Sequence, residues 1–199
     1  RRIDYELIDF CIRTGRLYES YPHHNAVFVG KDKDGQPRYA CLRGIGTDFK
    51  GEATGSDKRF SFSIPAKESS QVLYLFESAI DLLSFATMAQ EDRLPWRSQH
   101  LLSLAGVYQP KKNLAERRLP LALSQYLRDH REIQTIYLCL DNDLAGRSAA
   151  DAIRQQLAGK YVVRDGFPCQ GKDYNDWLCL RKGLPITRTV PKTERSIAR

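Results

Sequence analysis

Apolar runs and amphipathic stretches alternate along the chain after residue 70, and this alternation predicts strands and helices in turn. The apolar runs of strand length are 72–76, 101–104, 135–140 and 161–164. Residues with helical spacing occupy 78–90, 114–129 and 145–157. Strands that alternate with helices form parallel sheets through right-handed crossovers. We therefore expect an α/β fold in which a parallel sheet is flanked by helices.

The first seventy residues follow a different pattern, which predicts a small α+β subdomain. Its expected elements are a helix at 4–14 with Asp4 as its cap, strands at 25–31 and 37–43 around a tight turn, and a strand at 60–64. Residues 44–59 are rich in glycine and basic side chains and are predicted to form a basic loop. The expected division is a basic N-terminal subdomain at 1–70, an α/β domain at 71–182 and a basic tail or linker at 183–199.

Composition adds a weak indication of the partner. The chain has 199 residues and a net charge of +7, which favours a polyanion because phosphates neutralised by lysine or arginine release counterions. Its five cysteines are odd in number and contain no Cys-x-x-Cys pair, which is typical of reduced thiols in a cytoplasmic protein. No apolar run approaches the length of a membrane span, so no membrane partner is expected. Because the chain lacks an initiator methionine, we interpret it as a piece of a longer protein.

Three carboxylates follow predicted strands. Asp141 and Asp143 are two residues apart on an extended segment, so they point the same way, and at about 4 Å they would repel by roughly 4 kcal/mol at an effective dielectric of 20. Glu77 directly follows the strand at 72–76. If the first and third strands of this unit are neighbours, all three carboxylates meet at the switch point of the sheet, where α/β folds bind ligands. Oxygen ligands of this kind favour Mg²⁺ or Mn²⁺ over zinc.

The same residues also fit a structural role. Asp143 has the position of a cap for the helix near Ala145, Asp141 that of a turn residue, and Glu77 that of a first-turn acid favoured by the helix dipole. The coincidence of acids at the ends of two strands favours a site over this alternative.

At these residues the sequence resembles the Toprim family, the catalytic module shared by bacterial DNA primases, topoisomerases of types IA and II, and some nucleases. The likeness rests on Glu77 after the first strand and on Asp-x-Asp-x-x-Gly at 141–146 after the third. The paired alanines at 149–150 resemble the primase branch, and Gly171 to Asp176 is similar to a stretch that closes the domain in phage and mobile-element primases. Residues 1–70 resemble, more weakly, a region that precedes Toprim in plasmid and transposon proteins.

The resemblance implies roles for the site residues. Asp141 and Asp143 would bind a divalent metal, and Glu77 would be a further ligand or a general acid/base. Asp173 is another candidate metal ligand, with a purely structural role as its alternative. Lys172 would meet a phosphate as a point charge, unless it is only a solvated surface lysine. The basic residues Arg43, Lys50, Lys58 and Arg59 would hold a template strand or a nucleoside triphosphate, with Phe49 or Phe60 as a stacking face; the alternative is a solvated loop.

Three functions are consistent with this sequence. The leading hypothesis is Mg²⁺-dependent, primase-like nucleotidyl transfer, in which RNA primers are made on single-stranded DNA from nucleoside triphosphates. The module would belong to a replication or mobile-element protein and work with a helicase or relaxase. The second hypothesis is a Toprim-type, metal-dependent DNA nuclease, because the same cluster can activate water. The third is a DNA-binding or assembly module without catalysis.

Overall fold

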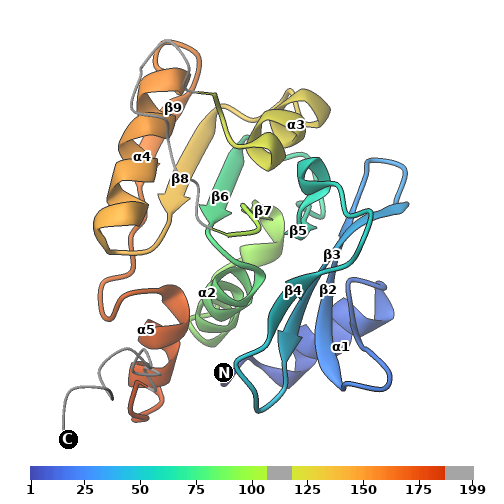
Figure 1. Cartoon of the computed structure of the whole chain (residues 1–199). Coiled ribbons are helices and arrows are strands. Elements are labelled where there is room, and N and C mark those ends of the chain that lie inside the picture. Colours follow the sequence, from blue (N-terminus) through green and yellow to red (C-terminus); the bar gives the residue numbers. More distant parts are fainter. Residues whose placement is uncertain (107–117, 187–199) are drawn as a thin grey trace, which may run out of the picture.

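A computed structural model describes residues 1–106 and 118–186, and it contains two β-sheets with helices packed around them (Figure 1). The first part of the chain forms α1 (Tyr5–Arg13), β1 (Leu17–Glu19), β2 (Asn25–Lys31), β3 (Pro37–Gly44), β4 (Lys50–Glu52), the 3-10 helix η1 (Lys58–Phe60) and β5 (Ser63–Ile64). The second part forms β6 (Val72–Phe76), α2 (Ala79–Glu91), the 3-10 helix η2 (Trp96–Ser98), β7 (His100–Ser103), α3 (Leu121–Asp129), β8 (Thr135–Cys139), α4 (Leu144–Leu157), β9 (Val162–Asp165) and α5 (Tyr174–Arg181).

The N-terminal part is an antiparallel sheet in the order β1-β2-β3-β4, with α1 beside it. Helix α1 begins where predicted, because the Asp4 carboxylate accepts the backbone N–H of Glu6 at 2.8 Å. The β2–β3 turn is held by Asp32, whose carboxylate accepts the backbone N–H groups of Asp34 and Gln36. The prediction of one basic loop over 44–59 is wrong, because this stretch contains β4 and the start of η1.

The second sheet has the order β5-β7-β6-β8-β9. Strand β6 pairs in parallel with both β7 and β8, and β8 pairs in parallel with β9. The first and third strands of this unit, β6 and β8, are thus neighbours, as the shared acidic site requires. The short strand β5 adds an antiparallel edge to β7, so the segment before residue 70 contributes to this sheet as well.

Side chains of β6 alternate between the two faces of the sheet, as the pleat requires. Leu73 and Leu75 pack in a cluster with residues of α3 and α4. Tyr74 and Phe76 point to the opposite face, where they meet α2 and α5. Both faces are therefore covered by helices, which explains why the strand at 72–76 reads as a continuous apolar run.

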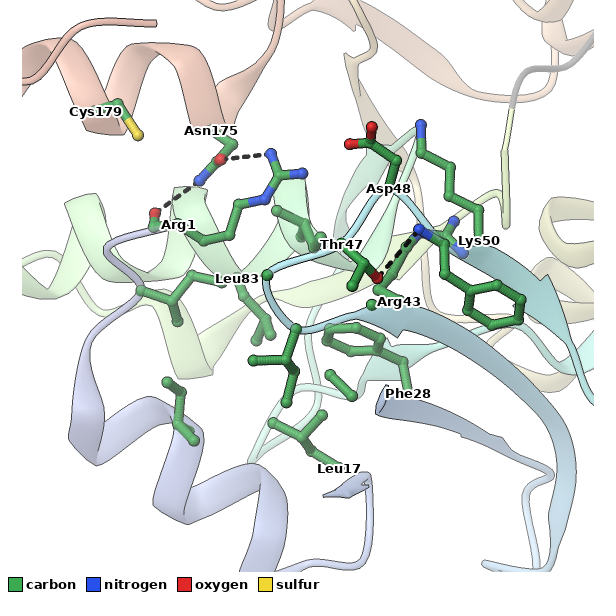
Figure 2. A pocket seen from close by; sticks show the side chains of 18 of the residues that line it. Arg1, Leu17, Phe28, Arg43, Thr47, Asp48, Lys50, Leu83, Asn175 and Cys179 are labelled. Atoms are coloured by element: carbon green, nitrogen blue, oxygen red, sulfur yellow. Dashed lines mark hydrogen bonds between the residues drawn. The ribbon is translucent and has the colours of Figure 1, made fainter. Parts of the chain in front are cut away.

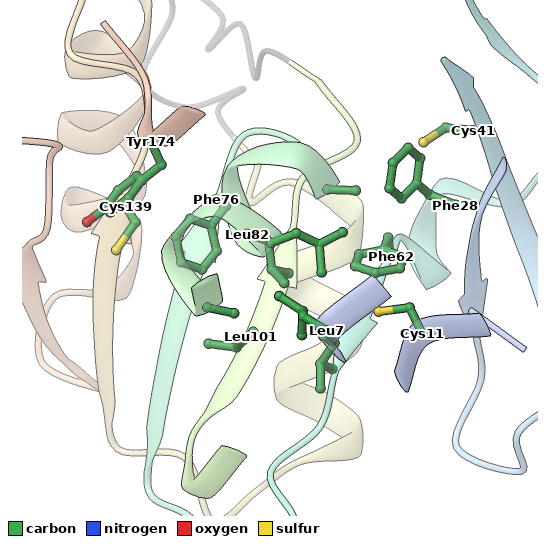
Figure 3. Close-up of a cluster of buried hydrophobic side chains, with 14 of the residues drawn as sticks. Leu7, Cys11, Phe28, Cys41, Phe62, Phe76, Leu82, Leu101, Cys139 and Tyr174 are labelled. Carbon is green, nitrogen blue, oxygen red and sulfur yellow. The ribbon is translucent and has the colours of Figure 1, made fainter. Parts of the chain in front are cut away.

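One hydrophobic core joins the N-terminal sheet to the parallel sheet. In Figure 3, Leu7 of α1 and Phe28 of β2 lie close to Phe62, and Leu82 and Leu101 continue the same cluster toward the parallel sheet. The Phe28 and Phe62 rings meet edge to face, with centroids 5.6 Å apart. The N-terminal part is therefore packed against the α/β part and is not a separate appendage.

Two further differences from the sequence prediction concern helices. Helix α3 begins at Leu121 and not at residue 114; the predicted residues 114–117 lie outside the described part of the chain, as does most of the predicted tail, 187–199. Helix α5 was not predicted, and it is capped at its start by Asp173. Within residues 1–106 and 118–186, we find no helix with both the length and the apolar character that crossing a bilayer demands.

Gly30 of β2 lies directly against the backbone of η1, and its replacement tests how tightly these two segments of the N-terminal part pack together. A Cβ atom at this position would lie 1.7 Å from the carbonyl oxygen of Phe60. We expect Gly30→Ala to lower the free energy of unfolding by about 3 kcal/mol through overpacking, measured by urea denaturation. Gly35→Ala is the control, because no atom lies within 4 Å of its added Cβ; its positive φ costs only about 1 kcal/mol. Equal losses in the two variants would contradict the close packing.

Candidate active site at the carboxyl edge of the parallel sheet

The two strands β6 and β8 end at the same edge of the sheet, and the predicted acidic residues follow them (Figure 1). Glu77 comes directly after β6, and Asp141 comes two residues after the end of β8. Asp143 is the N-cap of α4. The aspartate pair therefore leaves the sheet at the switch point, with Asp141 almost fully buried and Glu77 half-buried.

Asp143 has two roles in the structure, one for each carboxylate oxygen. Its Oδ1 accepts the backbone N–H of Gly146 at 2.9 Å, which caps α4. Its Oδ2 faces Lys172, with 3.2 Å to the Nζ atom. Gly146 is required here because a Cβ would lie 2.1 Å from the carbonyl oxygen of Asp141. The structural interpretation of Asp143 thus accounts for one of its oxygens and leaves the other directed at the site.

Lys172 provides the positive charge that the aspartate pair needs. Its Nζ lies 2.8 Å from Asp141 Oδ2, so one ammonium group bridges Asp141 and Asp143. The backbone holds this loop in place: Asn142 donates its N–H to the Lys172 carbonyl oxygen at 2.6 Å, and Lys172 donates its N–H to Asp176 Oδ2 at 3.0 Å. The hydrogen bond to Asp141 raises the pKa of Lys172, so this side chain stays protonated at neutral pH.

The carboxylates of the site differ in how readily they hold a proton. Burial, reinforced by the charge of Asp141, raises the pKa of Glu77 to about 7. Burial also raises the pKa of Asp141, although its hydrogen bond with Lys172 acts in the opposite direction. Asp143 is less buried, and the Gly146 N–H lowers its pKa. Near neutral pH Glu77 is therefore a carboxyl group that exchanges a proton easily.

Sequence reasoning missed a further carboxylate, Asp81. It lies in the first turn of α2, one helical turn after Glu77, and only 6% of it is exposed. Ser78 donates its hydroxyl to Asp81 Oδ2 at 2.5 Å, while burial raises the pKa of Asp81 to about 7. An acid four residues after Glu77 was a visible signal, but in the first turn of a helix it is ordinarily explained by the dipole.

Asp173 lies close to the same cluster, and the hydrogen bond that its side chain accepts is a helix cap. Its Oδ1 accepts the backbone N–H of Asp176 at 2.7 Å and so caps α5. Its charge also raises the pKa values of Asp81 and Asp141, which places it within electrostatic reach of the site.

The four predicted ligands, Glu77, Asp141, Asp143 and Asp173, do not form a ready-made metal cage. Among His, Cys, Asp and Glu side chains in the described ranges, the one group of three with ligand atoms close enough to share an ion is elsewhere, at the other edge of the sheet. At the carboxyl edge, the Lys172 ammonium occupies the space between Asp141 and Asp143. A divalent ion bound by both aspartates would therefore have to displace this lysine.

A cavity of about 610 Å³ lies between the 44–50 segment, α1, α2 and α5 (Figure 2). Its lining includes apolar side chains such as Leu17, Phe28 and Leu83 and the basic side chains of Arg43 and Lys50. The cavity also reaches Asp176, which holds the backbone of Lys172. This volume is typical of pockets for small ligands.

The four predicted basic residues fall into two groups. Arg43 and Lys50 line the cavity, together with Phe49. Lys58 and Arg59 do not belong to its lining. Lys58 instead pairs with Glu52 at 3.0 Å, and Arg59 forms a bidentate pair with Asp57. The Arg59 guanidinium also lies over the Phe60 ring, 5.6 Å from its centroid, so the ring face predicted for base stacking is already covered by a cation.

Comparison with known families finds two matches along the chain. A family model described as Toprim-like matches residues 74–178. A model described only as a protein of unknown function, DUF3991, matches residues 1–69.

One curated relative and several solved structures are similar to this chain. A 65 kDa protein of Zymomonas mobilis is 29% identical over 180 residues, which are 84% of this chain and 28% of that protein. The primase fragment of the bacteriophage T7 primase-helicase protein is 20% identical with a TM-score of 0.61, over 92% of this chain and 67% of that one. A DnaG primase catalytic domain bound to single-stranded DNA is 15% identical with a TM-score of 0.52, over 90% and 56% of the two chains.

These similarities establish an α/β fold shared with primase domains, as expected from the sequence. The chain spans little more than a quarter of the Zymomonas relative, so the activity of the full-length protein is not fixed by this likeness.

The raised pKa of Glu77 predicts a pH-dependent gain in stability for Glu77→Gln. The folded chain holds the Glu77 proton up to pH 7, whereas an unfolded glutamate loses it near pH 4.5; ionised Glu77 therefore destabilises the fold increasingly between these values. We expect the metal-free Gln variant to gain about 2 kcal/mol over wild type at pH 8 and almost nothing at pH 4.5, by urea denaturation with a chelator. Glu68→Gln, at an exposed position, should give no such difference. A gain that does not change with pH would contradict the burial of an ionised Glu77.

Proposed function

Because the chain belongs to the Toprim-like family, we propose that its acidic site transfers nucleotides to a growing RNA primer on a single-stranded DNA template, with Mg²⁺ or Mn²⁺ as the cofactor. The observation that carries this proposal is the meeting of Asp141, Asp143 and Lys172 at the switch point of a fold shared with primase domains. In the reaction, the primer 3′ hydroxyl attacks the α-phosphorus of a nucleoside triphosphate, and pyrophosphate leaves.

The donor set fits a hard divalent ion. Asp141, Asp143 and Glu77 offer only carboxylate oxygens. Burial raises the pKa values of Glu77 and Asp141 because it disfavours their ionised forms, which a bound cation would stabilise. Asp173 is a further candidate ligand through the oxygen that does not cap α5. A bound ion of this kind stabilises the negative charge that builds on phosphoryl oxygens.

Lys172 has two alternative positions in this proposal. Without an ion, its ammonium neutralises Asp141 and Asp143. When the aspartates bind a cation, the lysine is released, and its side chain is exposed enough, at 43%, to turn toward a phosphate group. The same residue would then contact the triphosphate or the leaving pyrophosphate.

Glu77 is suited to proton transfer at neutral pH. A general acid or base is most effective when its pKa lies near the working pH, and burial raises the pKa of Glu77 to about 7. Ionised Glu77 would accept the proton that leaves the attacking hydroxyl. Asp81, one turn further along α2, would help to hold this pKa high through its negative charge.

The cavity that extends to Asp176 is proposed to hold the nucleotide or the template. Arg43 and Lys50 supply positive charge for phosphates, and Phe49, which is half exposed, offers a stacking face. Lys58 and Arg59 are proposed to contact the nucleic acid backbone only after leaving their partners Glu52 and Asp57.

The wider context of the chain is proposed from its relatives. One similar structure is named as part of a primase-helicase, and another as bound to single-stranded DNA. We propose single-stranded DNA as the template and a helicase or relaxase as the working partner, in a replication or mobile-element protein.

Replacing Asp141 by asparagine should abolish primer extension. The change keeps the size of the side chain but removes one of the charges that hold the cation, so we expect a loss of roughly 10²-fold or more. The assay measures extension of an RNA primer annealed to single-stranded DNA, with nucleoside triphosphates and Mg²⁺, so that activity does not depend on primer initiation. Asp151→Asn, at an exposed position on α4, is the matched control and should extend at the wild-type rate.

The same experiment separates the rival functions. Equal extension by wild type and Asp141→Asn would exclude the proposed role of the site. Metal-dependent nicking of plasmid DNA without nucleotides, lost in Asp141→Asn, would instead indicate a nuclease. Neither activity, together with no saturable Mn²⁺ binding in calorimetry, would leave a non-catalytic DNA-binding or assembly module.

Replacing Lys172 by methionine should strengthen metal binding and weaken catalysis. The ammonium competes with a cation for Asp141 and Asp143, so its removal should raise Mn²⁺ affinity at least tenfold in calorimetry. Primer extension should fall because a phosphate contact is lost. Lys160→Met, an exposed lysine after α4, is the control for both measurements. Weaker Mn²⁺ binding in Lys172→Met would refute the competition between lysine and ion.

A further inference from the structure

A second cluster of metal-binding side chains lies at the amino edge of the parallel sheet, opposite the acidic site. His100 is the first residue of β7, His130 follows α3, and Glu132 precedes β8. The five residues of β8 separate this edge from the carboxyl edge, and at about 3.3 Å per residue the two sites are roughly 15 Å or more apart. The cluster therefore takes no part in the chemistry proposed for Glu77, Asp141 and Asp143.

The decisive feature is a buried nitrogen atom without a partner. His100 is 3% exposed, and its Nε2 makes no hydrogen bond within the part of the chain that the structure describes. The other ring nitrogen, Nδ1, lies 3.0 Å from the hydroxyl of Tyr126 and accepts the backbone N–H of Ala66 at 3.4 Å. Buried polar atoms normally have a partner, since an unsatisfied one costs about 1–3 kcal/mol.

The unpartnered nitrogen faces the two other side chains of the cluster. His100 Nε2 is 3.4 Å from Glu132 Oε1, and His130 Nδ1 is 3.3 Å from the same oxygen. Ligand atoms of all three residues lie within 4.8 Å of one another. In a tetrahedral zinc site with bonds near 2.0–2.1 Å, neighbouring ligand atoms are separated by about 3.3 Å. Two of the three separations thus already match such a site.

We propose that His100 Nε2, His130 Nδ1 and Glu132 Oε1 bind one Zn²⁺ ion, or a similar borderline transition metal, with water as the fourth ligand. Two imidazoles and one carboxylate are a known zinc donor set, whereas Mg²⁺ prefers oxygen alone. The exposed fractions of the His130 and Glu132 side chains, 24% and 37%, give the ion access and leave room for a water ligand.

The surroundings of His100 fit this assignment. In the structure, Nδ1 accepts the long hydrogen bond from the Ala66 N–H. An ion that takes the Nε2 lone pair moves the ring proton to Nδ1, which then donates it to the Tyr126 hydroxyl and gives up the Ala66 contact; this is the usual outer-shell arrangement of a metal-bound histidine. The Tyr126 ring also packs on the His130 ring, with centroids 4.2 Å apart, so one residue of α3 orients both histidines. The ion would tie the end of α3 to the starts of β7 and β8.

The test is Zn²⁺ titration of the whole chain by calorimetry, with Co²⁺ as a spectroscopic probe. The protein is prepared without a histidine tag, and a reductant keeps its thiols reduced. All variants are made in an Asp143→Asn parent and titrated in excess Mg²⁺, which suppresses Zn²⁺ binding at the acidic site. We expect one Zn²⁺ per chain and an intense, tetrahedral Co²⁺ spectrum. His130→Ala and Glu132→Gln should each weaken binding at least tenfold. The control His23→Ala, at an exposed position, should bind like its parent.

A melting experiment guards against misfolded variants. Zn²⁺ should raise the Tm of the parent protein, because it binds only the folded chain, and should leave the Tm of a folded His130→Ala or Glu132→Gln variant unchanged. Absence of Zn²⁺ binding to the parent, or equal affinity in the parent and both variants, would overturn the proposal and leave a polar cluster with a long His100–Glu132 contact. Because these readouts require no primer synthesis, failure of the proposed activity would not affect them.

Discussion

Strand β6 pairs with β8 in parallel, with Phe76 beside Cys139, so the residues that follow the two strands leave the sheet at one edge. This pairing brings Glu77 toward Asp141 although 64 residues of sequence separate them. It depends in turn on helices covering both faces, because neither face of a parallel sheet of apolar strands can be left in water. The core formed with Leu7, Phe28 and Phe62 completes that cover, so the N-terminal part supports the site from a distance.

This geometry concentrates negative charge at one edge of the sheet, and three groups in the chain reduce or stabilise that charge. A proton on Glu77 removes one charge near neutral pH, a backbone N–H from Gly146 stabilises Asp143, and the Lys172 ammonium bridges Asp141 and Asp143. The proposed divalent cation would replace the proton on Glu77 and the Lys172 ammonium, whereas the Gly146 N–H would keep Asp143 as the cap of α4. Two of the groups that stabilise the acidic cluster without metal are thus the groups that a bound metal would release.

The sequence predicted those parts of the structure that depend on local patterns. Runs such as 72–76 and the cap at Asp4 follow from periodicity and hydrogen bonding within a few residues, and the parallel sheet follows from alternating strands and helices. Strands of three residues, β1 and β4, are too short for any period to be recognised. The bridge formed by Lys172 was also missed, because it depends on how the loop before α5 packs on Asn142, which no spacing encodes.

The proposed zinc site could not be predicted from the sequence for the same reason. His100 and His130 are thirty residues apart in sequence and fit no zinc motif, so only the packing of α3 against β7 brings them together. The two edges of the sheet then offer different donor atoms. At the carboxyl edge these are carboxylate oxygens paired with the Lys172 ammonium, and at the amino edge they include the imidazole nitrogens, one of which, His100 Nε2, is buried and has no hydrogen-bond partner among the described residues. Mg²⁺ binds imidazole poorly, and zinc binds it well without having to displace a lysine. A chain with both sites would therefore sort the two ions by ligand type, and the abundant magnesium would be left to the carboxyl edge.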